Sequence, residues 1–542
     1  MSIMNGGQAL IQSLVQGDIT TVFGLPGAGQ YEGIDALYTE PRIRYISVRH
    51  EQATTYMADG YARVSGDIAA ALVVPGPGLF NALSGVATAY ATSTPLLLIT
   101  GVSHHRQKGV AYDDSPWLQG LTKWVGRANQ PGDIPHLVQE AIRQLRTGRP
   151  RPVALEISSA VFAAVEDVQL LRPKVSPVQT DKLREGESGT VEPEGIEEAA
   201  QRLIEAKRPV IWAGGGIMRA DAAAATQQLA EALQIPVVTT RQGKGTLPET
   251  HPLCLGMAET RYVPLGTWLE ERDLILAIGT SRDFTQATQQ IIKIDVDEVE
   301  LGQADHILNI HANACWGVEA LIEFIERTGS VKTDGLTNPH KDDAVYAEVQ
   351  ALKAARFNPV NQLQPQWDFM NAIRNALPKD GILVQGMNQM GYYSRNYFAA
   401  SAPSTYLTSS SHGTLGCAFP LALGAKVAKP DQAVVALSGD GGFLYCAQEL
   451  ATAVQYGINV VVIVFNDNAY GNVLRAQMEE FDGHVLGTQL HNPDFVQLAQ
   501  TYGARGTLAT DANELHRILS ESIDADGPTV IEVPVGMMKR EY

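Results

Sequence analysis

Residues 439–472 read GDGGFLYCAQELATAVQYGINVVVIVFNDNAYGN. The first four residues follow the apolar run AVVALS (433–438), which is typical of a buried strand. A helix-like segment comes next, and a second apolar run then ends in Phe465-Asn466-Asp467-Asn468. A strand, a glycine-rich turn, a helix and a second strand in this order predict one unit of a parallel α/β sheet.

The polar residues of this unit stand where a site for a diphosphate and a metal needs them. Asp440 ends one strand and offers an oxygen to Mg²⁺, while Gly441 and Gly442 let backbone N–H groups approach a phosphate at a helix N-terminus. Asp467 ends the next strand, and ligands bind at the carboxyl ends of parallel strands. Gly-Asp-Gly by itself is usually only a tight turn, but the whole unit favours a binding site.

This unit resembles the diphosphate-binding motif of thiamine-diphosphate enzymes, which begins with Gly-Asp-Gly and ends in an Asn pair after a second strand. The resemblance implies that Asp440, Asp467 and the carbonyl of Ala469 hold Mg²⁺. Asp467 stands where the family usually has Asn, which keeps an oxygen ligand and adds a negative charge. The residues that the resemblance further assigns to cofactor binding are Gly439, Gly441, Gly442, Tyr470 and Gly471.

A second motif lies in the first block, where Arg49-His50-Glu51-Gln52 opens a helical segment directly after the apolar run IRYISV. A lone Glu in the first turn of a helix is usually only a favourable partner of the helix dipole. The continuation YMADGYAR, however, resembles the helix that carries the catalytic glutamate of this family. The resemblance implies that Glu51 hydrogen-bonds the aminopyrimidine ring of the cofactor and so promotes removal of the C2 proton.

Two glycine-rich loops of the first block also match the family. FGLPGA (23–28) resembles the loop on the substrate side of the cofactor, and we assign Pro26 and Gly27 to cofactor binding and Ala28 and Gln30 to the catalytic site. PGPGLFN (75–81) matches the Gly-Pro-Gly loop, from which we assign Gly76 to the cofactor. Phe80 is either a wall of the substrate pocket or a plain packing residue.

The third block carries two further candidate segments. SHGTLG (411–416) aligns with the family segment whose bulky apolar residue bends the cofactor, which implies this role for Leu415 and a cofactor contact from Gly413. Without the flanking glycines, Leu415 would be an ordinary core leucine. His412 is a catalytic candidate, and Asn388 and Gln389, after the run GILVQG, are candidates for touching the diphosphate.

The alternation of short apolar runs and helical segments predicts an α/β protein of three doubly wound domains with parallel sheets. We assign residues 1–170 to a pyrimidine-binding domain, 196–330 to a central domain and 361–542 to a diphosphate-binding domain. Polar stretches at 171–195 and 331–360 are predicted to be linkers. The first and third blocks are similar in length and in their alternation of strands and helices, which suggests a remote duplication of one domain.

The loop sequences look most like acetolactate synthases, with benzoylformate decarboxylase and oxalyl-CoA decarboxylase as relatives, but departures stand near the expected pocket. AYDD (111–114) stands where these enzymes carry Phe-Gln-Glu, so that Asp113 becomes a catalytic candidate beside the substrate and Tyr112 a substrate-binding candidate. Asp113 is equally a solvated loop acid. His104 and His105 follow the run PLLLIT and are either proton shuttles or a structural pair.

The central block is shorter after GTSRD (279–283) than in members of the family that bind a flavin, so that FAD is not expected. Gly214-Gly215-Gly216 is a glycine run that contacts a nucleotide in some folds, but by itself it is weak support. We therefore predict a structural central domain without a nucleotide.

Composition excludes several classes of function. The net charge of −18 argues against binding to nucleic acid or to an anionic membrane. The four cysteines lie far apart and predict neither a zinc site nor a disulfide framework, and the first residues do not look like a signal peptide, so we expect a cytoplasmic protein.

We therefore expect a thiamine-diphosphate- and Mg²⁺-dependent lyase or carboligase that acts on a 2-keto acid or an aldehyde. The alternatives are a simple 2-keto acid decarboxylase, a 2-hydroxyacyl- or oxalyl-CoA lyase, and a homologue that binds without turnover. The family builds its site between the first domain of one chain and the third domain of another, which implies a homodimer or homotetramer.

Overall fold

The structure is a computed structural model, and it describes residues 2–102, 115–171, 194–329, 343–409 and 411–540, together with the backbone of 105–107 and 110–112. The described residues divide into two compact units. The first unit comprises the described parts of Met1–Gln179, Gly381–Gly391 and Ser409–Met537, and the second those of Thr180–Asp380, Tyr392–Thr408 and Met538–Tyr542. Each unit is described by itself.

The first sheet of the first unit is entirely parallel. Its strands, in spatial order, are β3 (Arg44–Ser47), β2 (Thr21–Gly24), β4 (Ala69–Val73), β5 (Leu96–Thr100), β9 (Val153–Ile157) and β8 (Val125–Ala128). The helices of this block are α1 (Gly6–Gln16), α2 (Tyr31–Tyr38), α3 (Glu51–Ser65), α4 (Pro77–Ala91), α5 (Ser115–Leu121), α6 (Ile134–Arg146) and α7 (Ser159–Ala163). Two short antiparallel pairs complete it, β1 (Ser2–Asn5) with β10 (Val165–Val168) and β6 (His105–Gln107) with β7 (Val110–Tyr112).

Periodicity explains how these helices pack. The buried residues of α6 recur at helical spacing, at Ile134, Val138, Ala141, Ile142 and Leu145, and so form one apolar stripe against the sheet. The central strands β4 and β5 are buried at every position, as expected for a parallel sheet with helices on both faces.

The second sheet of the first unit carries the GDGG segment. Its strands within this unit, in spatial order, are β17 (Ile382–Gln385), β19 (Val434–Gly439), β20 (Val461–Asn466), β22 (Thr529–Pro534) and β21 (Arg505–Leu508), all parallel. The helices around it are α16 (Ala418–Ala428), α17 (Asp440–Leu444), α18 (Glu449–Gln455), α19 (Gly471–Glu480), α20 (Phe495–Thr501) and α21 (Ala512–Ile523). Helix α15 (Gln389–Tyr397) begins just after β17.

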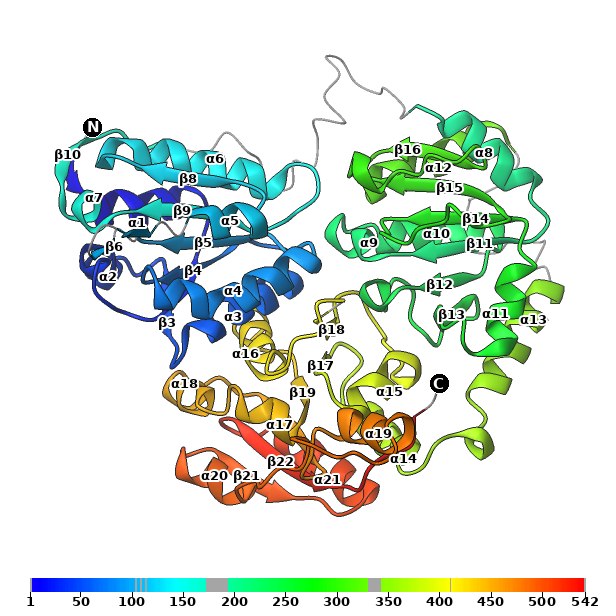
Figure 1. Cartoon of the computed structure of the whole chain (residues 1–542). Coiled ribbons are helices and arrows are strands. Elements are labelled where there is room, and N and C mark those ends of the chain that lie inside the picture. Colours follow the sequence, from blue (N-terminus) through cyan, green and yellow to red (C-terminus); the bar gives the residue numbers. More distant parts are fainter. Residues whose placement is uncertain are drawn as a thin grey trace. The chain divides into compact units, whose positions relative to one another are not determined.

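The two sheets of this unit are joined through α3 and α16, which lie side by side (Figure 1). Two glycines let the helix backbones touch. A Cβ on Gly60 would lie 2.1 Å from the carbonyl oxygen of Leu421, and a Cβ on Gly424 would lie 1.9 Å from that of Met57. Larger residues at either glycine would force the helices apart.

The second unit holds the central sheet. Its strands, in spatial order, are β13 (Cys254–Met257), β12 (Val237–Thr239), β11 (Pro209–Ala213), β14 (Leu274–Ile278), β15 (Gln290–Asp295) and β16 (Ile307–His311). Its helices are α8 (Ile196–Glu205), α9 (Gly215–Arg219), α10 (Ala223–Leu233), α11 (Val263–Glu270), α12 (Ala314–Arg327), α13 (Asp343–Arg356) and α14 (Gln366–Ala376), with the short strand β18 (Tyr406–Thr408). Short 3₁₀ turns occur at Pro131–Asp133, Arg241–Gly243, Glu298–Glu300 and Pro359–Asn361.

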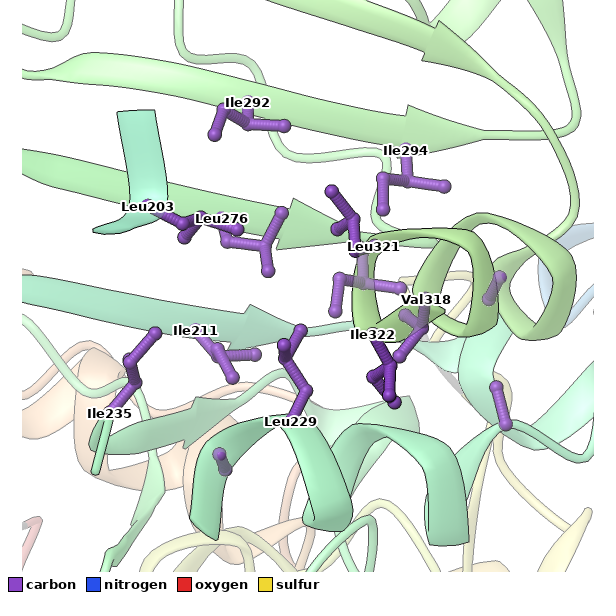
Figure 2. Close-up of a cluster of buried hydrophobic side chains, with 14 of the residues drawn as sticks. Leu203, Ile211, Leu229, Ile235, Leu276, Ile292, Ile294, Val318, Leu321 and Ile322 are labelled. Atoms are coloured by element: carbon purple, nitrogen blue, oxygen red, sulfur yellow. The ribbon is translucent and has the colours of Figure 1, made fainter. Parts of the chain in front are cut away.

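One face of the central sheet packs against α10 and α12 (Figure 2). Ile211, Leu276 and Ile292 project from neighbouring strands toward Leu229 of α10 and Leu321 of α12. This core belongs to the second unit alone and contains no residue of the predicted site.

The predicted architecture of three α/β domains with parallel sheets is confirmed. Helix α13 lies within residues 331–360, which the sequence predicts to be a linker, and the domain boundaries stay predictions. Among the described residues, no helix combines the length and the apolar character that a membrane crossing needs.

Candidate active site

The metal-site candidates gather at the carboxyl edge of the third-block sheet. Asp440 is the first residue after β19, and Asp467 follows β20, which pairs with β19 in parallel so that Gly439 lies opposite Phe465. The backbone N–H of Ala469 donates to Asp440 Oδ2 at 3.2 Å and to Asp467 Oδ1 at 3.3 Å. Two carboxylates thus converge on one backbone amide, and their binding of Mg²⁺ stays a prediction.

The electrostatics of this pair favour a cation. Burial raises the pKa of Asp440, against hydrogen bonds from the backbone of Gly441 and the Asn492 amide that lower it. Burial, and then the nearby Asp440 charge, raise the pKa of Asp467 to about 6. The described residues contain no group of three or more His, Cys, Asp or Glu side chains arranged around one ion. Two carboxylates and a carbonyl suit Mg²⁺, which prefers few protein ligands together with phosphate oxygens and water.

Gln389 and Asn388 make hydrogen bonds within the protein at this edge. Gln389 Nε2 donates to Asp467 Oδ2 at 2.7 Å, and its Oε1 accepts from the buried Arg475 at 3.2 Å. Asn388 donates to the carbonyl of Leu437 and accepts from the N–H of Gly391. Gln389 therefore orients a candidate metal ligand, and the Asn388 amide joins β17 to β19, so that a direct diphosphate contact of either stays a prediction.

Glycines make the edge close-packed. A Cβ on Gly471 would lie 2.0 Å from Asp467 Oδ2, and a Cβ on Gly441 would lie 2.6 Å from the ring of Tyr470. By contrast, the nearest atom to a Cβ on Gly442 is 3.6 Å away, and the nearest to one on Gly439 is 3.1 Å away. Side chains at the first two positions would displace a carboxylate or an aromatic ring that the edge needs.

Glu51 is the first residue of α3, and His50 is the N-cap, whose Nδ1 accepts from the N–H of Gln52. The Asn81 amide donates to Glu51 Oε2 at 3.0 Å. Glu51 Oε1 lies against Gly78, where an added Cβ would stand 3.2 Å away. Asn81 belongs to the PGPGLFN motif, but no role could be assigned to it from the sequence.

Gly76 shapes the loop that faces Glu51. Its φ of 69° and ψ of −119° form the N-cap of α4, a conformation that L side chains rarely adopt. On the neighbouring loop, a Cβ on Gly27 would meet Val74 Cγ1 at 2.5 Å. The glycine-rich loops around Glu51 therefore need glycine for backbone conformation and for close approach.

The other candidates on the FGLPGA loop differ in exposure. Pro26 and Ala28 are exposed, whereas Gln30 is 1% exposed and neither atom of its amide has a hydrogen-bond partner. A buried amide without a partner is costly unless a ligand satisfies it. Gln30 therefore fits a site residue better than its neighbours do.

The segment with Leu415 turns sharply between Gly413, whose φ is 66°, and Gly416, whose φ is 79°. The Thr414 hydroxyl hydrogen-bonds the Tyr56 hydroxyl of α3 at 2.9 Å, and this contact holds the segment against the first block. Leu415 is half-buried and His412 is exposed.

The remaining substrate candidates are only partly described. Phe80 stacks edge-to-face on Trp117 of α5 at 6.3 Å between ring centroids, and both rings are partly exposed. His105 and Tyr112 face each other in the β6–β7 ladder, but their side chains lie outside the described residues. His104 and Asp113 lie outside them altogether.

The site residues therefore form two groups. The described side-chain contacts of Glu51 come from the first block, and those of Asp440 and Asp467 come from the third block. The two blocks touch elsewhere, because the backbone N–H groups of Arg49 and His50 donate to Glu449 of α18. No sequence pattern singled out Glu449.

Three family models match the chain in order. The N-terminal TPP binding domain of thiamine pyrophosphate enzymes matches residues 4–125, the central domain matches 196–328, and the C-terminal TPP binding domain matches 386–533.

Curated relatives match nearly the whole chain. A probable acetolactate synthase large subunit of Methanococcus aeolicus is 31% identical over 98% of this chain and 92% of its own. A probable 2-ketoarginine decarboxylase of Pseudomonas aeruginosa is 33% identical over 98% of this chain and 94% of its own. The acetolactate synthase large subunit of Corynebacterium glutamicum is 31% identical over 98% of this chain and 87% of its own.

The matched domains, the near full-length relatives and the geometry of the two motifs agree. The chain belongs to the thiamine pyrophosphate enzyme family and is an acetolactate-synthase-like, thiamine-diphosphate-dependent carboligase or lyase.

Proposed function

We propose that the protein binds thiamine diphosphate through Mg²⁺ held by Asp440, Asp467 and the Ala469 carbonyl, and joins two 2-keto acid molecules in an acetolactate-type reaction. The observation that carries the proposal is the convergence of both carboxylates on the Ala469 amide at the carboxyl edge of the sheet. Bound there, the cofactor supplies a nucleophilic carbon and an electron sink.

The chain's own residues would hold a proton and orient the cofactor. Glu51 holds a proton at the aminopyrimidine side, and Asn81 fixes the carboxyl group by donating to Oε2. Leu415, between two glycines of positive φ, would offer an apolar surface to the cofactor. Gly27 lets its loop pack closely on Val74, and Gly76 gives the next loop a turn that other residues rarely adopt.

A second copy of the chain completes the site in this proposal. The described contacts of Glu51 and of the metal-site residues form separate sets, which supports a site shared between two chains. Exposed apolar side chains beside the GDGG segment, Leu444 and Tyr445, supply a surface that a second copy can cover. We propose a homodimer or a tetramer located in the cytoplasm, and light scattering tests the assembly.

A simple decarboxylase is the second candidate function. The relative named as a probable 2-ketoarginine decarboxylase supports it, and so does the sequence departure at Asp113. A cationic side chain on the keto acid would suit the negative charge of the protein.

The experiment is product analysis by NMR after incubation with pyruvate, thiamine diphosphate and Mg²⁺, and separately with 2-ketoarginine. Acetolactate supports the leading proposal. Acetaldehyde from pyruvate, or the shortened aldehyde from 2-ketoarginine, supports the decarboxylase instead. Release of CO₂ from neither substrate argues against both 2-keto acid proposals.

The purified protein also tests the proposed cofactor set. We propose that EDTA removes activity and that Mg²⁺ restores it. We further propose that the central unit carries no FAD, so that the protein lacks flavin absorbance near 450 nm. Activity that survives exhaustive chelation contradicts the metal proposal.

A further inference from the structure

The turn that precedes the catalytic-glutamate helix is held from outside its own block. Ser47 N–H donates to the Tyr456 hydroxyl at 3.0 Å, and the Arg49 side chain donates to Gln455 at 2.6 Å. The Gln52 amide reaches Cys446 Sγ at 3.6 Å. Residues on both sides of Glu51 are thus attached to one segment of the third block, residues 446–456.

Glu449 lies at the centre of this attachment. Its Oε1 accepts from the backbone N–H of Arg49 and of His50, both at 3.1 Å, and its Oε2 accepts from the Thr452 hydroxyl at 2.6 Å. The side chain is 0% exposed. Burial raises the pKa of Glu449 to about 7. A buried carboxyl that receives two consecutive backbone N–H groups fixes the position of that backbone.

Glu51 turns away from this attachment. Among residues 49–52, Arg49, His50 and Gln52 contact the third block, whereas the Glu51 carboxylate contacts Asn81 and Gly78 of the first block. Glu449 therefore holds the backbone directly before Glu51, while the Glu51 side chain points to the loop of Gly78 and Asn81.

We propose that Glu449 is a positioning residue, which holds the Arg49–His50 backbone so that the Glu51 carboxylate meets the cofactor in the productive geometry. The inference rests on the proposed function, because it takes Glu51 as the catalytic carboxylate. A displacement of about 1 Å at a reacting group reduces the rate by about 100-fold.

Two variants of Glu449 separate its hydrogen bonds to the Arg49–His50 backbone from its charge. Glu449→Gln keeps an oxygen that accepts from both N–H groups and a nitrogen that donates to the Thr452 hydroxyl. Glu449→Leu fills the space but leaves two buried N–H groups without an acceptor. Positioning predicts that Gln retains kcat within about threefold and that Leu lowers it by about 10-fold or more.

The matched control is Asp273→Leu in the second unit. The Asp273 carboxylate also accepts from two consecutive backbone N–H groups, those of Lys207 at 2.7 Å and Arg208 at 3.0 Å. Hydrogen exchange by mass spectrometry on the protein without cofactor should show faster exchange in the peptide around residues 47–52 for Glu449→Leu only. The control should exchange faster around residues 207–208 and keep its kcat.

A double-mutant cycle completes the test, with kcat measured on the cofactor-saturated full chain and cofactor affinity measured by titrating the cofactor-free full chain with thiamine diphosphate in the presence of Mg²⁺. Since Glu449 acts through Glu51, adding Glu449→Leu to Glu51→Gln should lower kcat no further. Additive losses, or equal losses of kcat in Glu449→Leu and Asp273→Leu, overturn the inference. Full activity of Glu51→Gln instead overturns the proposed function, so the two failures are distinguishable.

Discussion

Glu449, Asp440 and Asp467 are carboxylates of the third block, the first two buried and the third half-buried, but their surroundings differ. Glu449 stands alone and receives two backbone N–H groups and a hydroxyl. Asp440 and Asp467 share one N–H group and face each other. Burial raises the pKa of all three. All three receive N–H donors, and what differs is the second carboxylate. A lone carboxyl with two backbone donors supports the backbone, whereas two converging carboxylates make a place for a cation.

The largest effect is expected at the residue that Glu449 supports. Glu51→Gln keeps the shape and the Asn81 contact but loses the carboxylate, so kcat should fall by about 100-fold or more. Cofactor affinity, measured by isothermal titration calorimetry, should change by less than about threefold, because Glu51 lies apart from the metal edge. An equal loss of affinity and kcat would place Glu51 in binding rather than in catalysis.

Asp440→Asn tests whether the two converging carboxylates bind Mg²⁺. The substitution removes one of two converging carboxylates, so Mg²⁺ affinity in the presence of thiamine diphosphate should fall by about 10- to 100-fold. Titration calorimetry measures this change. Asp494→Asn is the control, because Asp494 caps α20 through the N–H of Gln497 and lies outside the metal edge. Unchanged metal affinity in Asp440→Asn contradicts the ligand assignment.

Substitution of Gln389, at the same edge of the sheet, should have a smaller effect on Mg²⁺ affinity. Its amide donates to Asp467 and accepts from Arg475, so it links a carboxylate to a buried cation. Gln389→Leu should weaken Mg²⁺ binding by about 10-fold, since groups that orient metal ligands commonly contribute this much. Gln497→Leu is the control on the same block. A loss of thiamine diphosphate affinity, with Mg²⁺ affinity kept, would instead favour the diphosphate contact that the sequence predicted for Gln389.

The fold could be predicted from sequence where a strand is buried along its whole length, because such a strand appears as an apolar run. Strands β4, β5 and β20 are buried at every position and appear as continuous apolar runs. Strand β8, whose sequence is VGRA, is buried only at alternate residues at the end of its sheet, so no apolar run marks it. The sheets of the first and third blocks have the same strand order, β2-β4-β5-β9-β8 and β17-β19-β20-β22-β21. This likeness supports the suggested duplication, and it could be seen only in the structure.

The site was predictable where chemistry depends on local spacing. Asp440 and Asp467 could be assigned from sequence because adjacent parallel strands bring their ends together. Glu449 could not, because its partners lie 399 and 400 positions away. The contacts of Gln389 to Asp467 and Arg475 could not be predicted either, because side-chain direction follows from packing and not from spacing.

The smallest expected effect concerns the charge on Glu449. With the pKa raised from 4.5 to about 7, the folded protein retains a proton that the unfolded chain releases between these pH values. Stability should therefore fall as pH rises from about 4.5 to about 7, and this loss should remain at higher pH. The Arg49 charge and the Thr452 hydroxyl, which lower the pKa, and the Cys446 thiol also face this group.

Glu449→Gln has no proton to release, so it removes this pH dependence while keeping the contacts to Arg49 and His50. We expect its Tm to exceed that of the natural protein by a few degrees at pH 8, and by much less at pH 5. Differential scanning calorimetry at both pH values measures the difference. A gap that is the same at both pH values would mean that Glu449 is ionised throughout this range. The carboxyl would then hold the turn before Glu51 as a charged acceptor, and the Gln variant should lose part of that hold.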